Sequence, residues 1–222
     1  MMGVQFRHVA TERRQCGRWV VLLVALVFAG CAPRLKPLGG APAPARLPRS
    51  ELAPGHRRIV FEWDLADRDV TGRGEGVARI AAPDSARLDF FLAGGFGSGG
   101  AVLIGDSLRL PGGEIGRRFV PPPPLLWAAL GRLALPAVPD TVARVDGNVL
   151  RVDIGRPTAW RITFRDDTLR RVERISGARI VEWLERVGDV VRYRNEEARR
   201  ALLLTIKRVE EVPAFDGSIW GP

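Results

Sequence analysis

The sequence predicts a mainly β (α+β) fold, in which a curved antiparallel sheet carries one apolar helix across its concave face. From residue 56 onward, apolar and polar residues alternate with a period of two, which is typical of strands with one buried face. Turn signals follow one another at short intervals, so the connections are too short for the helical crossovers that parallel strands need. A single apolar segment with proline at its start interrupts this rhythm and predicts the helix.

The chain begins with an export signal, which we place at residues 1–30. Basic residues, among them Arg13, Arg14 and Arg18, precede an uninterrupted apolar run at 19–30. A run of about 12 residues is too short for a transmembrane helix, which needs roughly 20, and is typical of a signal peptide.

The apolar run ends in small residues before a cysteine, Ala29-Gly30-Cys31. This pattern resembles the lipobox of bacterial lipoproteins, with Phe28 at the position where leucine is commonest. The resemblance implies cleavage before Cys31, attachment of acyl chains to Cys31, and a lipid-anchored protein that faces the periplasm. Ala32 favours the outer membrane, and the inner membrane stays open. The alternative is an ordinary signal peptide with a chance cysteine.

Residues 31–56 are rich in proline and poor in large apolar residues. Such a segment buries too little surface to fold alone, and its prolines favour extended conformations. We therefore expect a tether at 31–56 and a single folded domain at 57–222.

Within the folded domain, apolar residues share one face in the segments 59–65, 86–92, 150–154 and 160–164. Further strands are expected near 168–175, 179–186, 189–194 and 200–209. The predicted turns between strands are Pro83-Asp84, Gly105-Asp106, Asp146-Gly147-Asn148, Asp166-Asp167, Ser176-Gly177 and Gly188-Asp189. This arrangement predicts an antiparallel meander.

The predicted helix follows the prolines of 121–124 and runs over 125–133. It is apolar on nearly every side, so water can cover little of it. We expect it to lie across the concave face of the sheet.

An exported lipoprotein with a long antiparallel meander and a midway apolar helix resembles the LolA/LolB superfamily, the carrier and receptor of outer-membrane lipoprotein sorting. The resemblance covers about 57–210 and is closest over 86–110, where strand, loop, strand, turn and strand follow in order. It implies an incomplete β-barrel under a helical lid, with a cavity for acyl chains. It also implies membrane contact for Phe96, which replaces an exposed leucine of the receptor. The alternative is that Phe96 folds back onto the domain.

Aromatic and aliphatic residues of the strands and helix either line such a cavity or fill a core. The predicted lipid-binding residues are Phe61, Trp63, Leu88, Phe90, Leu126, Trp127, Leu130, Trp160, Ile162 and Phe164. Both outcomes are compatible with their spacing.

The sequence offers little material for catalysis. After cleavage it holds one histidine, His56, and one cysteine, which carries lipid, so a catalytic triad or zinc site lacks residues. Asp166-Asp167 and Glu210-Glu211 are expected to be solvated, because adjacent strand residues point to opposite faces. The glycine pattern at 95–100 precedes a strand instead of the helix that a dinucleotide site needs. We expect no enzyme, metal or cofactor.

The chain has a formal charge of +9, nearly all of it from arginine. Export removes nucleic acid as a partner. We therefore expect a monomer whose partners are the membrane, through the lipid anchor, and lipid or lipoprotein cargo. The alternative is a structural or interaction lipoprotein without a cavity, and an internal apolar cavity of several hundred Å³ would distinguish the two.

Overall fold

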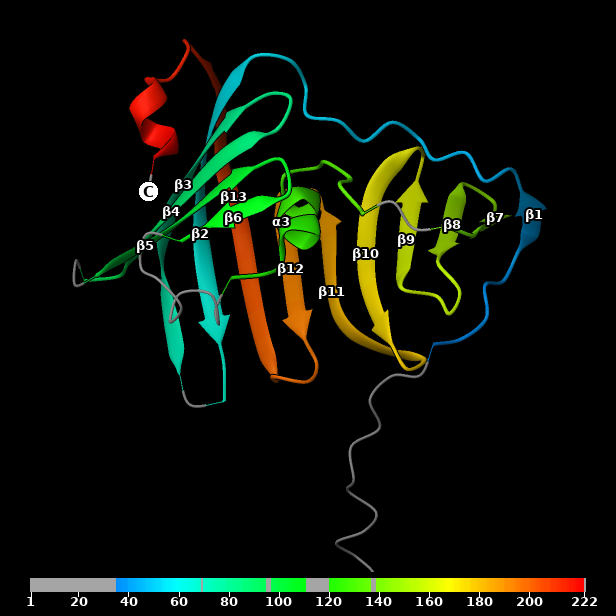
Figure 1. The fold of residues 1–222 in the computed structure, drawn as a ribbon. Helices are drawn as coiled ribbons and strands as arrows, with labels where there is room; N and C mark the ends of the chain where they lie inside the picture. The colour runs from blue at the N-terminus through cyan, green and yellow to red at the C-terminus, as the bar shows by residue number, and fades with distance from the viewer. Residues whose placement is uncertain (1–34, 69, 95–96, 111–119, 137–138, 222) are drawn as a thin grey trace, which may run out of the picture. The chain divides into compact units, whose positions relative to one another are not determined.

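The computed structural model describes residues 35–68, 70–94, 97–110, 120–136 and 139–221. The chain separates into two compact units, Met1–Ala32 and Pro33–Pro222, and the described residues belong to the second unit. These residues form one antiparallel sheet of 13 strands, drawn in Figure 1. The mainly β fold class is confirmed.

The strands lie in the order β1-β7-β8-β9-β10-β11-β12-β13-β2-β3-β4-β5-β6. The last strand therefore pairs with an early one, β13 with β2, over the whole length of β2. Short hairpins join consecutive strands from β2 to β6 and from β7 to β13, as predicted. Residues 44–55 connect β1 to β2, and residues 110–140, which include the helix, connect β6 to β7. The bounds are β1 Ala41–Ala43, β2 His56–Ala66, β3 Thr71–Ala81, β4 Ser85–Leu92, β5 Ser98–Ile104, β6 Ser107–Arg109, β7 Thr141–Asp146, β8 Val149–Ile154, β9 Trp160–Arg165, β10 Thr168–Ser176, β11 Arg179–Val187, β12 Val190–Asn195 and β13 Arg200–Val212.

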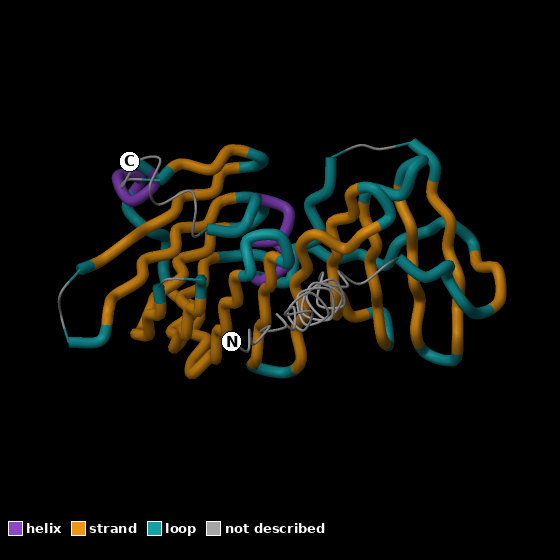
Figure 2. The backbone as a smooth tube through the Cα atoms, turned by 90° about the horizontal axis from the view of Figure 1, so that it is seen from below, coloured by secondary structure: helices purple, strands orange, loops and turns teal. Residues whose placement is uncertain are grey.

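The sheet is curved, as Figure 2 shows from below, and the apolar side chains of one of its faces form the core. On β2 the side chains of Ile59, Phe61 and Trp63 are buried, whereas Glu62 and Asp64 are exposed. The face that period-two alternation predicts for this strand is thus confirmed.

Period-two alternation does not predict β3, because the residues of this strand that face inward at its start are glycines. A Cβ atom at Gly76 would lie 2.3 Å from the ring of Phe61, so only glycine leaves room for that ring. The glycines remove the apolar half of the alternation, and a pattern search finds no strand there.

The helix α3 (Pro123–Ala129) is the one α-helix among the residues that the structure describes. Proline occupies its first turn, as predicted, and Leu125 to Ala129 are all buried against β10 and β11. It is shorter than expected because Gly131 adopts φ 92°, a left-handed conformation that ends helices. A short 3-10 helix, η1 (Gly217–Trp220), packs near β4.

The expected tether is corrected for its described part, 35–55. The strand β1 pairs with β7, the Leu35 backbone N–H donates to the carbonyl of Ala178 (2.9 Å), and Leu47 and Leu52 pack against the core. A proline-rich segment builds no core of its own, but its extended backbone fits the free edge of a sheet, where proline is tolerated. The segment therefore belongs to the fold.

Candidate functional site

A cavity of about 570 Å³ lies between α3 and the concave face of the sheet. Its walls come mainly from β2, β4, β12, β13 and the end of α3. Apolar side chains dominate them, among them Ile59, Phe61, Trp63, Leu65, Leu88, Phe90, Leu126, Ala129, Leu130, Leu184, Val191, Leu202, Leu204 and Ile206.

Aromatic rings form one wall of the cavity. Phe90 makes edge contacts with Phe61 and Trp63, with ring centroids 5.5 and 6.0 Å apart. The indole N–H of Trp63 donates to the carbonyl of Glu75 (2.9 Å), so this wall presents carbon to the cavity. Such a surface binds apolar groups without demanding a hydrogen bond from them.

The charged side chains at the cavity bind one another. The Arg87 Nε donates to Asp89 (2.9 Å), Arg79 pairs with the same carboxylate, and a second Arg87 nitrogen donates to the carbonyl of Ile219 (2.9 Å). Because these charged groups already pair with one another and with the backbone, they attract a polar ligand only weakly.

Tyr193 contributes the other polar wall, and its hydroxyl is also engaged. It donates to the buried Glu182 carboxylate (3.0 Å), which accepts further bonds from Asn195 Nδ2 (2.6 Å) and Arg174 Nε (2.7 Å). Burial, followed by the negative charge of Glu182, raises the pKa of Tyr193. The phenol is therefore neutral at physiological pH.

The structure brings six of the predicted lipid-binding residues to the cavity: Phe61, Trp63, Leu88, Phe90, Leu126 and Leu130. The other four, Trp127, Trp160, Ile162 and Phe164, are buried in the core away from it. Trp127 is fully buried, and its indole N–H donates to the carbonyl of Gly105 (2.8 Å). Cys31 and Phe96 lie outside the described residues.

The cavity residues of β11 to β13 were not among the predicted lipid-binding residues. Leu202, Leu204 and Ile206 alternate with a period of two, and so do Val191 and Tyr193. The alternation predicts that these side chains face inward. The sequence does not show that β13 pairs with β2, which is the pairing that brings Ile206 beside Phe61.

Within the described ranges, no group of histidine, cysteine, aspartate or glutamate residues could hold a metal ion. Among the same residues, none of the helices has the length and apolar character to cross a membrane. Asp166 and Asp167 form the exposed turn between β9 and β10.

No family model matches the sequence, and no curated protein matches it. Among solved structures, the chain is similar to a LolA superfamily protein from Nitrosomonas europaea, with 8% identity, a TM-score of 0.46, and coverage of 78% of this chain and 93% of that one. It is also similar to a putative outer membrane lipoprotein-sorting protein domain from Vibrio parahaemolyticus, with 6% identity, a TM-score of 0.46, and coverage of 75% of this chain and 89% of that one. A third similar structure is a DUF1329 family protein from Desulfovibrio piger, with 10% identity, a TM-score of 0.42, and coverage of 76% of this chain and 90% of that one. The chain is thus structurally similar to proteins of the LolA superfamily.

Proposed function

We propose that this protein is a non-catalytic lipoprotein, anchored through Cys31 to the outer membrane and facing the periplasm, that binds acyl chains of lipid or lipoprotein cargo beneath α3. The observation that carries the proposal is the cavity of about 570 Å³, which lies within the range of about 300–1,000 Å³ typical of ligand pockets. A structural lipoprotein without a ligand needs no such space. In the same proposal, Phe96 contacts the bilayer.

The cavity chemistry supports an aliphatic ligand. Its walls are aromatic and aliphatic, and the polar groups Arg87, Asp89 and Tyr193 bind other protein groups. Each methylene that leaves water contributes about 0.8 kcal/mol, so affinity grows with chain length. Apolar walls discriminate poorly between similar chains, so we expect weak selectivity.

A cavity-filling substitution tests the proposal. Leu204 lines the cavity from β13, and Thr205 is its neighbour on the opposite face. Leu204→Trp should lower the affinity for a fluorescent fatty acid at least tenfold, whereas Thr205→Trp should leave it within about twofold, since a displaced chain loses several methylene contacts. Equal affinities in the two variants would reject the cavity as the binding site.

The anchor is tested in cells by fractionation. Cys31→Ser removes the thiol that accepts lipid, and we expect this variant to leave the outer-membrane fraction. Retention there at the wild-type level would contradict lipidation of Cys31.

A further inference from the structure

The hairpin turns of the sheet divide between two ends, because every strand is antiparallel to its neighbours. We call one the arginine end; it holds the turns at 67–70, 155–159, 177–178 and 196–199 and the connection after β4. The opposite, aspartate end holds the turns at 83–84, 105–106, 146–148, 166–167 and 188–189.

The two ends carry different charges. At the arginine end the exposed basic side chains are Arg68, Arg73, Arg156, Arg179, Arg192, Arg194 and Arg199. Acidic groups are also present: Glu196 pairs with Arg194 (3.1 Å), Asp140 lies 4.0 Å from Arg156, and Asp67 pairs with the buried Arg200 (2.8 Å). Asp64, beside Arg73, and Glu197 are exposed, so the arginines outnumber the acidic groups at this end without excluding them. At the other end, every turn contains aspartate, namely Asp84, Asp106, Asp146, Asp166, Asp167 and Asp189. Basic groups also lie there: Arg46 and Arg49 in the crossing segment 44–55, Arg165 at the end of β9, and Arg58 and Arg208, which both pair with Glu210 (2.6 and 2.9 Å).

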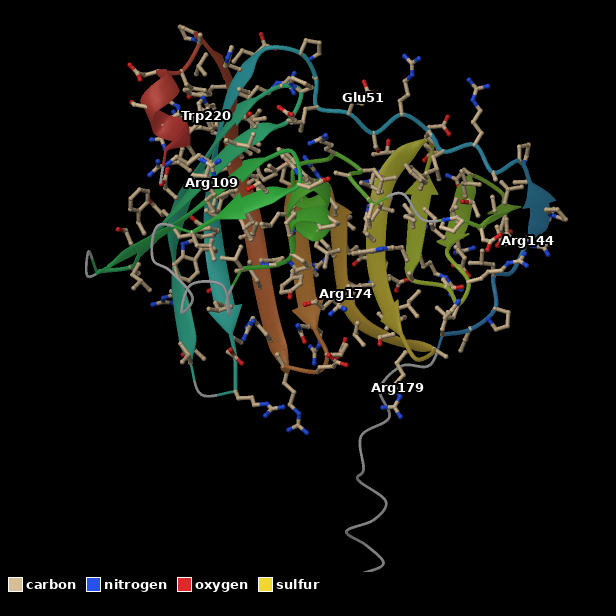
Figure 3. The ribbon with its side chains drawn as sticks, in the orientation of Figure 1. Glu51, Arg109, Arg144, Arg174, Arg179 and Trp220 are labelled. Carbon is tan, nitrogen blue, oxygen red and sulfur yellow. The ribbon has the colours of Figure 1, made fainter. Side chains whose placement is uncertain are left out.

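The chain enters the fold at the arginine end. Leu35 bonds to Ala178 in the turn between β10 and β11, where Figure 3 shows Arg179 projecting beyond the strands. Only four peptide units separate Leu35 from Cys31, and they span at most about 14 Å. Because residues 35–55 pack on the sheet, they do not lengthen the connection between Cys31 and the folded unit. An acyl-modified Cys31 would hold this end close to the bilayer.

Apolar groups accompany the arginines. Phe91 and Leu92, at the end of β4, and Val70, between β2 and β3, are 46%, 41% and 48% exposed. Phe91 and Leu92 also line the cavity. A second hollow of about 860 Å³ shares Leu65, Leu92, Tyr193 and Leu202 with the cavity, and Arg73, Arg192 and Arg194 line it as well.

We propose that the arginine end docks on an anionic phospholipid bilayer, so that the hollow adjoining the cavity faces the membrane surface. The position of the anchor in this proposal rests on the proposed function, whereas the charged and apolar surface stands without it. Guanidinium groups bind phosphate oxygens through paired hydrogen bonds, and exposed apolar side chains enter the interfacial region. Each arginine near such a surface strengthens binding about fivefold.

Vesicle flotation of residues 31–222 carrying Cys31→Ser tests the surface, since this chain contains the whole compact unit and no lipid. We expect it to bind vesicles containing phosphatidylglycerol, and high salt or pure phosphatidylcholine to weaken the binding. Replacing Arg179, Arg192 and Arg194 by glutamate should reduce binding by at least about a hundredfold. The matched control replaces the exposed Arg46, Arg49 and Arg165, which changes the net charge equally, and should lose less than tenfold. Equal losses, or binding that ignores phosphatidylglycerol, would overturn the proposal.

A labelling experiment measures the orientation without altering the arginines. The two cysteines of the sequence are Cys16 and Cys31, so this chain contains none. A single cysteine is placed at Ser176 or at Thr168, the exposed ends of β10. A dye at 176, and not at 168, should be quenched by a lipid-borne quencher; the reverse result or equal quenching would overturn the proposal. Fatty-acid affinity without vesicles tests the cavity separately, so loss of that binding alone would reject the cargo and leave the docking surface.

Discussion

At the scale of single residues, the Tyr193 hydroxyl is the group whose surroundings most constrain its chemistry. It is buried at the cavity wall and donates to the carboxylate of Glu182 (3.0 Å). Ionisation would bury a second negative charge beside the first, so the pKa of Tyr193 is raised. The folded protein therefore holds this proton at pH values where the unfolded chain, with a tyrosine pKa of about 10, releases it.

This difference predicts an alkaline limit to stability. The contribution of the Tyr193 proton is complete below about pH 10 and is lost as the pH rises above that value towards the higher folded pKa. Tyr193 is the only tyrosine in the sequence, so tyrosinate absorbance reports on it alone. We expect no tyrosinate signal near pH 10 in the folded protein, and a normal titration in urea. Tyr193→Phe, as the control, should show no signal in either state, and a normal titration of the folded wild type would refute the burial of this phenol.

Residue patterns predicted one wall of the cavity and missed the other for physical reasons. Phe61 and Trp63 alternate with Glu62 and Asp64, and a half-buried strand requires this pattern. Trp160 and Phe164 show the same alternation but fill the core. The alternation predicts only that a side chain faces inward, and does not distinguish a side chain packed against others from one that borders a cavity. Periodicity gives the face of a strand, whereas the position of the cavity depends on which strands are neighbours.

At the scale of elements, the segment 35–55 shows how composition misleads about boundaries. Its prolines exclude a self-sufficient fold, and the prediction of a tether assumed that no other surface would receive it. The backbone N–H of Leu133 donates to the carbonyl of Ser50 (2.9 Å), and β1 pairs with the edge strand β7. The segment gains order from contacts that are distant in sequence.

We therefore predict that residues 57–222 alone are less stable than residues 33–222. Truncation removes the half-buried Leu47 and Leu52, worth about 1 kcal/mol each, and exposes the edge of β7. Urea denaturation should show a loss of about 2–4 kcal/mol in the free energy of unfolding. Leu47→Ser with Leu52→Ser in the longer chain should reproduce part of the loss, while the exposed Ala45→Ser should not. Identical urea midpoints for the two chains would support the original prediction that this segment is a tether outside the fold.

At the scale of the whole folded unit, the single sheet carries two kinds of interior. Beneath β8, β9 and β10, side chains such as Val152, Ile162 and Phe164 are fully buried and pack together. Beneath β2, β4 and β13, the glycines of β3 admit large rings, and the space next to α3 stays open as the cavity. The helix packs on β10 and β11, and its residues Leu126 and Ala129 also line the cavity, so it lies where the two regions meet. A ligand in the cavity would thus complete the packing of one region and leave the other unchanged.

Hydrogen exchange with and without a saturating fatty acid tests this division. Amides that exchange through local opening should slow in β2, β4 and β13, because opening there would expose the bound chain to water, and should keep their rates in β8 and β9. At a ligand concentration of 100 times Kd, the protection gained corresponds to at most about 2.7 kcal/mol. Leu204→Trp, which fills the cavity, should abolish the ligand-dependent change and slow the same amides in the absence of ligand. Slowing confined to β8 and β9 would place the acyl chain outside the cavity and against the part of the interior that the structure shows filled.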